Sequence, residues 1–463
     1  MLRRLMILIS VLLVVGASQA LAENPIIQTN FTADPAPLVH DGVVYLYTSH
    51  DEDDAEGFKM LDWRLYSSTD MVNWTDHGVV ASLATFPWAV QSNDAWAPQV
   101  VERHGKFYLY VPISVAGEPK NVIAVAVADS PLGPFKDALG RPLISAGQGN
   151  IDPTVAIDRD GQAYLYWGNP HLWYVKLNED MISYAGDIVQ VDAPSDYQEG
   201  PWFYRRGGHY YMAYASSCCP EGIGYAMSDS PVGPWIRQGL IMAPSEMSTG
   251  NHPGIVDYRG ASYVFGFSYR LNFAMTPIHH ERRAVSVARL SYNDDGTIPT
   301  VPWWNDGGVA QLEPVNPYRR VEAETLSWTS RVRRDRDRVY DWAPGGKTAQ
   351  DESAAIFLTN ILDRDYTKVS GVNFGERGAT TFAARVASGS NGGRAELRLD
   401  RADGALIGTL TVPNTGGWNE WRTISTPVTG VSGAHDLYIV FHGADGQALF
   451  NFDYWQFERH ARR

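Results

Sequence analysis

The sequence predicts an all-β protein in which a five-bladed β-propeller is followed by a β-sandwich of the jelly-roll type. Five copies of one strand-turn-strand pattern occupy the first two thirds of the chain, and no long stretch shows the 3.6-residue periodicity of a helix. At 463 residues the chain also exceeds what one hydrophobic core usually serves, so two domains are expected.

The repeat has a polar or aromatic residue closely before Pro, then an apolar stretch, Gly, two further residues and Tyr. Each copy is typical of a strand, a tight turn at Gly and a second strand that carries Tyr. The turn glycines lie 63, 56, 47 and 52 residues apart, which suits one four-stranded sheet per repeat. The repeats begin at Asp34, Trp96, Asp152, Glu199 and His252, and their turn glycines are Gly42, Gly105, Gly161, Gly208 and Gly260.

The pattern changes after the proline-containing stretch 313–317. From there to the C-terminus, strand-like runs alternate with Gly-rich turns, which predicts a β-sandwich over residues 318–459. The propeller is assigned to residues 23–312. Because the spacer is short, we expect docked domains rather than a flexible tether.

The N-terminus predicts export. Arg3 and Arg4 precede an apolar run that ends in Ala20, Leu21 and Ala22, as in a cleavable signal peptide of residues 1–22. The run is too short to span a bilayer comfortably. We therefore expect a secreted or periplasmic protein with no membrane association after cleavage.

Charge and composition narrow the class of partner. A formal net charge of -14 disfavours nucleic acid, whose binding depends on Lys and Arg at phosphates. A neutral, hydroxyl-rich partner fits better, and the 24 Tyr, 15 Trp and 16 Phe supply flat faces for sugar rings. Aromatic abundance is also ordinary for β-rich proteins, so composition alone leaves this open.

The two cysteines, Cys218 and Cys219, are adjacent. A bridge between neighbours requires strained geometry, so we expect two inert, partly buried thiols.

Three repeats begin with an acid. The innermost strand of every blade lines the central channel, so Asp34, Asp152 and Glu199 are expected around one pocket. Like charge and burial raise the pKa of at least one of three crowded carboxyls, and groups with such shifted pKa values are typical of functional sites. Cleavage of a glycosidic bond uses them directly, because one carboxylic acid protonates the leaving oxygen while a carboxylate activates water or attacks carbon. Each motif alone is also an ordinary turn at the start of a strand.

The repeat starts resemble glycoside hydrolase family 43 over roughly residues 24–312. This resemblance implies a five-bladed propeller that acts by inversion on xylans and arabinans. It makes Asp34 the general base, Glu199 the general acid and Asp152 the residue that tunes and positions the acid. Inversion places the carboxyls of Asp34 and Glu199 about 6.5–9.5 Å apart. The matching segments are Ala33-Asp34-Pro35, Trp96-Ala97-Pro98, Ile151-Asp152-Pro153 and Glu199-Gly200-Pro201-Trp202.

The same resemblance assigns weaker roles near the pocket. Arg283 matches an arginine that clamps sugar hydroxyls, and its alternative is an exposed strand charge. His252 matches a channel histidine that helps hold a divalent cation, often calcium through water, and its alternative is a hydrogen-bonded structural group. Trp96 and Trp202 are expected to wall the sugar pocket, or else to pack between blades. Asp94 is expected to support the site.

Residues 318–459 resemble a family 6 carbohydrate-binding module. The resemblance implies a structural calcium ion held by Glu322, Glu324 and Asp453, and a sugar cleft that contains Trp418 and Asn451. Asn360 stands where a second aromatic is expected, which weakens sugar binding by about 1 kcal/mol or more. The matching segments are Val321-Glu322-Ala323-Glu324, Asp365-Tyr366, Phe374-Gly375, Gly416-Gly417-Trp418-Asn419-Glu420-Trp421, His435-Asp436-Leu437-Tyr438 and Asn451-Phe452-Asp453-Tyr454-Trp455.

Together these observations predict a hydrolase that removes terminal or side-chain pentoses from xylan, arabinoxylan or their oligosaccharides, as a β-D-xylosidase, an α-L-arabinofuranosidase or both. An endo-acting α-1,5-arabinanase is the alternative enzyme, and the loops around the channel decide between them. A non-catalytic polysaccharide-binding protein is the third reading, which three crowded acids disfavour.

Overall fold

The computed structural model describes residues 20–117, 120–147, 149–247, 251–304, 308–330 and 356–459. The predicted signal peptide thus lies mostly outside the described residues. Its last residues pair with the end of the propeller, where Ala22 donates its backbone N–H to Val309 O over 2.8 Å.

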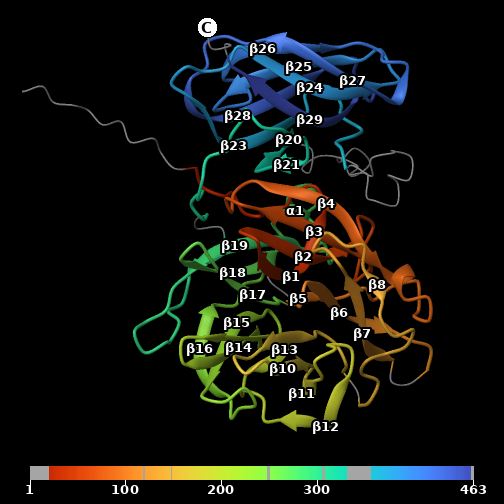
Figure 1. Ribbon diagram of the computed structural model, residues 1–463, viewed down its shortest axis with the longest axis vertical. Helices are drawn as coiled ribbons and strands as arrows, with labels where there is room; N and C mark the ends of the chain where they lie inside the picture. Colours follow the sequence, from red (N-terminus) through yellow and green to blue (C-terminus); the bar gives the residue numbers. More distant parts are fainter. Residues whose placement is uncertain are drawn as a thin grey trace, which may run out of the picture.

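The first part of the chain is a five-bladed β-propeller, as predicted (Figure 1). Its five sheets follow one another along the sequence, each with antiparallel neighbours. We number the blades 1 to 5 in chain order. Blade 1 contains β1 (Phe31–His40), β2 (Val43–Asp51), β3 (Met60–Ser68) and β4 (Trp74–Ser82), followed by a short 3-10 helix (Leu83–Thr85); blade 2 contains β5 (Gln99–Arg103), β6 (Lys106–Ser114), β7 (Asn121–Ala128) and β8 (Lys136–Asp137); blade 3 contains β9 (Thr154–Ile157), β10 (Ala163–Trp167), β11 (Leu172–Leu177) and β12 (Tyr184–Val191); blade 4 contains β13 (Tyr197–Arg206), β14 (His209–Ser216), β15 (Gly222–Ser228) and β16 (Ile236–Met242); blade 5 contains β17 (Gly254–Tyr258), β18 (Ala261–Ser268) and β19 (Ala284–Leu290).

The repeated glycine sits in the hairpin that joins the first two strands of a blade. In blade 1 the strands pair up to His40 and Val43, which leaves Asp41 and Gly42 as a two-residue loop. Both loop residues have positive φ, 48° and 76°. This backbone matches the twist of the flanking strands and favours glycine at the second position. Blades 2 and 5 repeat this geometry at His104-Gly105 and Arg259-Gly260.

Blade 5 differs from the expected four strands, because the described part of its sheet has three. The N-terminal segment lies beside β19 instead, where Ile26 N–H bonds Val285 O over 2.9 Å and Thr32 N–H bonds Arg283 O over 2.8 Å. The segment leads directly into β1, so the two ends of the propeller close the ring. The described helix α1 (Arg270–Met275) has six residues and follows β18.

The C-terminal part is the predicted β-sandwich, with a separate apolar core between two sheets. The last propeller strand ends at Leu290 and the first sandwich strand begins at Val321, on either side of the predicted spacer. One sheet contains β20 (Val321–Glu322), β29 (Asn451–Glu458), β24 (Thr381–Ser388) and β27 (Gly417–Pro427), and the other contains β22 (Trp328–Thr329), β23 (Tyr366–Gly375), β28 (Gly433–His442), β25 (Gly393–Leu399) and β26 (Ala405–Val412).

The two domains are docked rather than tethered. Strand β21 (Thr325–Leu326) leaves the sandwich and pairs with β4 as a fifth strand of blade 1 (Figure 1). Beside it, Asn73 donates to Ser370 O over 3.0 Å and accepts from Ser370 N–H over 2.8 Å. These buried reciprocal bonds fix the module against blade 1.

The two cysteines correct a prediction. Cys218 and Cys219 form a disulfide with each other, and both residues are exposed in the loop between β14 and β15. The expectation of partly buried thiols was therefore wrong. No helix in the described ranges is long and apolar enough to cross a membrane.

Candidate active site

The innermost strands begin with an unusual backbone. Asp34 and Asp152 have φ of 52° and 58°, and Gly200 has φ of 59°. Each directly precedes a proline, and the pairing of β1 and β13 shifts register around these points. Left-handed φ is costly for an aspartate and is retained where the surroundings fix it, often at functional sites. Since Gly200 occupies the place of the two aspartates, Glu199 lies one residue earlier in its repeat.

Gly200 also lets blade 4 approach blade 5. A Cβ atom at this position would lie 2.7 Å from the ring of His252. A side chain here would therefore displace the histidine from the centre of the site.

The repeat starts surround a cavity of about 250 Å³. This volume lies below the roughly 300–1,000 Å³ of common small-molecule pockets, which suits one sugar ring better than a polymer chain. The cavity gathers six of the residues predicted in the propeller and four that the sequence did not predict. The predicted ones are Asp34, Trp96, Asp152, Glu199, His252 and Arg283, and the others are Phe58, Met60, Ile151 and Asn169.

His252 lies between the three acids. Its Nδ1 is 3.4 Å from Asp34 Oδ1, and its Nε2 is 3.5 Å from Glu199 Oε1 and 3.7 Å from Asp152 Oδ2. Burial alone would lower the pKa of His252, but the carboxylates of Asp152, Asp34 and Glu199 raise it to about 10. Both ring nitrogens therefore face carboxylates and the imidazolium supplies a positive charge. A divalent cation near His252 stays a prediction.

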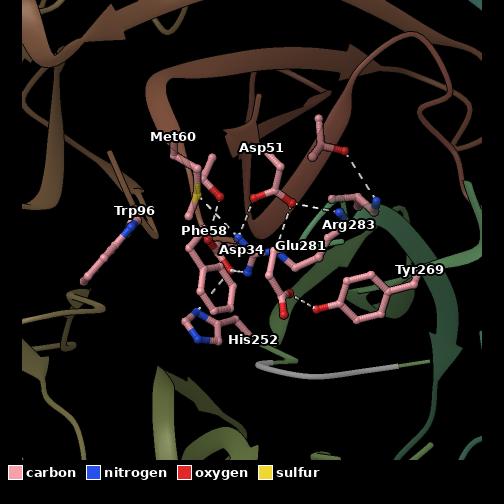
Figure 2. Close-up of polar contacts among 12 residues, drawn as sticks. Asp34, Asp51, Phe58, Met60, Trp96, His252, Tyr269, Glu281 and Arg283 are labelled. Carbon is pink, nitrogen blue, oxygen red and sulfur yellow. Dashed lines mark hydrogen bonds and ion pairs between the residues drawn. The ribbon is translucent and has the colours of Figure 1, made fainter. Parts of the chain in front are cut away.

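Arg283 is buried beside the proposed base. Its Nη1 donates to Asp34 Oδ1 over 3.0 Å, while Nε and Nη2 hold the two oxygens of Asp51 over 3.0 and 2.8 Å. Ser49 Oγ donates to Asp34 Oδ2 over 2.5 Å. Figure 2 shows Asp34 between Arg283 and His252. Trp96 lies on the opposite side of Asp34 from Arg283. The alternative of an exposed strand charge was therefore wrong for Arg283.

We expect Arg283→Met to lower the free energy of unfolding by about 3–5 kcal/mol, because it leaves the buried carboxylates of Asp34 and Asp51 without their cation. Burial already raises the pKa of Asp51 in spite of Arg283. Urea unfolding measures the effect as a shifted midpoint at constant slope. The control is Arg289→Met, an exposed position on β19, the strand that directly follows Arg283, and it should change stability by about 0.5 kcal/mol or less. Equal losses in both variants would contradict the role of Arg283.

Asp152 and Glu199 differ in protonation. Burial raises the pKa of Asp152 to about 7 against the opposing charge of His252, with smaller upward contributions from Glu199 and Asp34. Burial would also raise the pKa of Glu199, but hydrogen bonds from His252 and Asn169 shift it downward. Below about pH 7 the higher pKa of Asp152 places the proton of the pair on Asp152, beside the proposed acid. Because the two carboxyls interact, the pair titrates as one unit.

We expect kcat/KM on unactivated substrates to fall as the pH rises through about 7. The raised pKa keeps one proton on the Asp152–Glu199 pair below that pH, where it is available to the leaving group, and the proton is lost above it. The measurement is kcat/KM between about pH 5 and about pH 9. A dinitrophenyl glycoside, whose leaving group needs no proton, should lack the alkaline decline. A flat profile to pH 9 on both would contradict the assignment.

The three remaining predicted residues of the propeller, Trp96, Trp202 and Asp94, lie in different surroundings. Trp96 lines the cavity. Trp202 lies with the prolines of the inner strands, outside the described lining of this cavity, and donates to Ile255 O over 3.0 Å. It packs between blades, so the prediction that Trp202 walls the sugar pocket was wrong. Asp94 accepts a hydrogen bond from Ser114 and supports blade 2.

In the module, Trp418 and Asn451 come together as predicted, but only the tryptophan faces solvent. Trp418 is 39% exposed, whereas Asn451 is buried. Asn451 donates to Trp418 O over 2.8 Å and accepts from Thr359 Oγ1 over 2.6 Å. It therefore supports Trp418 from behind, and a sugar contact of its amide stays a prediction.

The predicted calcium ligands lie near one another, but two of them form ion pairs with arginines. Arg320 binds Glu322 over 2.7 Å, and Asp453 receives a hydrogen bond from Arg385. Glu324 is buried, and its Oε2 has no hydrogen-bond partner in the described ranges. Burial, helped by Glu322 and Asp453, holds the pKa of Glu324 well above its usual range. An unpaired buried carboxylate oxygen beside two further acids suits a calcium ion.

Three groups of described residues bring at least three ligand atoms close enough to share an ion, and the predicted calcium set is not one of them. They are Asp152, Glu199 and His252 in the cavity, His50, Glu52 and Asp62 in blade 1, and the two cysteines with Glu221. In the second group, His50 Nδ1 already contacts Asp62 over 3.2 Å.

Sequence reasoning missed Asp51 and Asn169. Asp51 ends the second strand of blade 1, and only the folded ring brings it to Arg283, 232 residues away. Asn169 follows the second strand of blade 3 in Gly168-Asn169-Pro170. The available signal was a polar residue in the loop after the second strand of a repeat that begins with an acid.

Comparisons with known proteins agree with this geometry. Residues 22–298 match glycosyl hydrolases family 43, and residues 339–459 match the carbohydrate binding module of family 6. An arabinoxylan arabinofuranohydrolase of Bacillus subtilis (strain 168) is 35% identical over 94% of this chain and 92% of its own. A xylosidase/arabinosidase of Bacteroides ovatus is 30% identical over 59% of this chain and 95% of its own.

Solved structures show the same relationship. A family 43 arabinoxylan arabinofuranohydrolase from Bacillus subtilis, in complex with cellotetraose, has a TM-score of 0.80 at 33% identity and covers 94% of this chain and 97% of that one. A β-xylosidase/α-arabinofuranosidase from a compost metagenome, in a calcium-free form with xylotriose, has a TM-score of 0.55 at 29% identity over 61% of this chain and 98% of its own. The chain therefore belongs to glycoside hydrolase family 43 and is a glycoside hydrolase with a C-terminal family 6 carbohydrate-binding module.

Proposed function

We propose that this hydrolase removes single pentose units from xylan-type polymers with inversion, and that its main activity is the release of α-L-arabinofuranosyl side chains from arabinoxylan. The observation that carries the proposal is a cavity with room for one sugar, in which Asp34 and Glu199 lie on either side of His252. The arabinoxylan arabinofuranohydrolases of Bacillus subtilis and Paenibacillus polymyxa, similar over 94% of this chain, support the choice of linkage.

In the proposed mechanism, a water molecule attacks the anomeric carbon and gives its proton to Asp34. The glycosidic C–O bond breaks, and the proton of Glu199 passes to the leaving oxygen. Asp152 holds its carboxyl near Glu199 and accepts the backbone N–H of Gly200 over 3.1 Å. The imidazole between the two acids keeps them apart, which supports inversion. A separation near 5 Å in a solved structure would instead indicate retention.

The test is a panel of substrates. We expect release of nitrophenol from the nitrophenyl α-L-arabinofuranoside and of arabinose from arabinoxylan, with an unbroken xylan backbone. Faster cleavage of the nitrophenyl xyloside and of xylobiose would establish the β-D-xylosidase alternative, since the same pocket fits either pentose. Activity on linear arabinan alone would establish the endo-arabinanase. Inactivity on every substrate would favour a binding protein.

We also propose that the module binds calcium through Glu322, Glu324 and Asp453, with Arg320 displaced. The unpaired Oε2 of Glu324 supports this site. At a calcium concentration of about 100 Kd, binding stabilises the module by about 2.7 kcal/mol.

A chelator is therefore expected to lower the melting temperature of the full chain, and added calcium to restore it. The change should vanish in Glu324→Gln, whose own melting temperature serves as the control. Identical melting with and without chelator would remove the module site. A loss of activity that calcium restores, without a change in melting, would instead place an ion near His252.

Export completes the proposal. We infer that the mature protein begins near Glu23 and acts in the periplasm or outside the cell. N-terminal sequencing of the protein from a secreting host tests this start.

A further inference from the structure

The proposed acid, Glu199, has two oxygens in different surroundings. Asn169, in the loop between β10 and β11 of blade 3, donates its side-chain N–H to Glu199 Oε2 over 2.5 Å. The other oxygen, Oε1, lies 3.5 Å from His252 Nε2. Both Glu199 and Asn169 line the cavity. The amide thus holds one oxygen from the neighbouring blade and leaves the other toward the centre of the site.

The backbone around Asn169 is fixed on several sides. Asn169 N–H bonds Gly149 O over 3.3 Å, and a Cβ atom at Gly149 would lie 2.2 Å from Asn169 O. Gly168 N–H bonds Ile151 O over 2.9 Å, and Tyr197 Oη donates to Gly168 O over 2.5 Å. Ile151 precedes Asp152 and Tyr197 lies two residues before Glu199. The loop therefore ties the strands of both acids together, and its position depends on glycine at 149.

An asparagine suits a partner that gains and loses a proton. Its amide donates through Nδ2 to a carboxylate and, after rotation, accepts through Oδ1 from a carboxylic acid, and it carries no charge in either case. A lysine or arginine would hold Glu199 as the anion, and an aspartate would repel that anion. The amide supports both protonation states that a general acid passes through in one turnover.

We propose that Asn169 is a positioning residue, which holds Glu199 Oε2 so that Oε1 is presented to the leaving oxygen of the substrate. This inference rests on the proposed function, in which Glu199 is the acid. Asn169 itself touches neither the anomeric carbon nor the attacking water in this mechanism.

The test is Asn169→Asp, which keeps the shape and removes the donor, with Asn169→Ala as a second variant. We expect kcat on arabinoxylan and on the nitrophenyl arabinofuranoside to fall about 10- to 100-fold, while KM stays within about threefold. With the dinitrophenyl arabinofuranoside, kcat should fall less than about threefold, because its leaving group departs without a proton. The readout is the ratio of kcat between the two aryl substrates, which a merely structural role would leave unchanged.

The matched control is Asn178→Asp in the same blade, an exposed asparagine that donates to Ser183 Oγ over 2.8 Å outside the cavity. It should leave both aryl substrates at wild-type rates. Equal losses on both aryl substrates in the Asn169 variants, or failure of both variants to fold by circular dichroism, would overturn the positioning role. A wild-type chain inactive on every arabinofuranoside would overturn the proposed function instead, so the two failures are distinguishable.

Discussion

Replacing Glu199 by Gln is expected to lower kcat on arabinoxylan and on xylobiose or arabino-oligosaccharides by about 10²- to 10⁴-fold, the usual contribution of a general acid. Glutamine keeps the size of the side chain and an oxygen for Asn169, but it has no proton to give to the leaving oxygen. Steady-state rates on substrates of graded leaving-group pKa measure the effect, which should shrink toward dinitrophenyl glycosides.

The outcome separates the acid from its neighbours. If Glu199→Gln hydrolyses xylobiose and arabinoxylan at wild-type rates, the acid assignment is wrong. If it loses the same factor on every leaving group, Glu199 acts on the water or on binding rather than on the leaving oxygen. In the wild type the carboxyl of Glu199 faces His252. Binding of the released pentose to the variant therefore checks that the pocket around this contact is intact.

The second large effect is expected from Asp34→Asn. This variant lacks the carboxylate that receives the proton of the attacking water, so kcat should fall about 10²- to 10⁴-fold on activated and unactivated substrates alike. Independence from the leaving group distinguishes the base from the acid. Asp34 also faces Arg283 and His252, so the variant leaves two cations with less compensation and some loss of stability is expected.

Asp94→Asn is the matched control for this experiment. Asp94 is also a buried aspartate with positive φ near the start of a blade, and it bonds Ser114 rather than the cavity residues. We expect its kcat within a fewfold of wild type. An equal loss in both variants would mean that Asp34 acts through the fold of its blade, and the base would have to be sought elsewhere.

The repeat in the sequence was enough to predict the ring and its chemistry. A two-residue turn with glycine and the alternation of apolar residues are local features, so Asp41-Gly42 and the strands beside it could be predicted from neighbouring residues. The position of Asp34, Asp152 and Glu199 in equivalent places then followed from symmetry. Phe58 and Met60 could not be found in this way, because they lie just before and at the start of β3, away from the residues that define the repeat.

The weaker predictions failed where the direction of a side chain decided the outcome. Trp202 follows the acid by three residues, yet the shift in register at β13 turns it toward Ile255 and away from the sugar cavity. Asn451 begins β29 of the module, and its amide bonds Trp418 O and Thr359. The cysteines were expected as thiols because a bridge between neighbours needs strained geometry, yet the loop between β14 and β15 holds that bridge.

By itself the sequence determined the architecture, the three acids and the class of reaction, because repeats, turns and residue types are properties of short segments. Tertiary structure alone decided which partners those acids have. Arg283 reaches Asp34 and Asp51 across more than 200 residues, and Asn169 reaches Glu199 from another blade. Such pairs depend on closure of the ring, where residues remote in the chain exclude water from one another and so set which carboxyl keeps its proton.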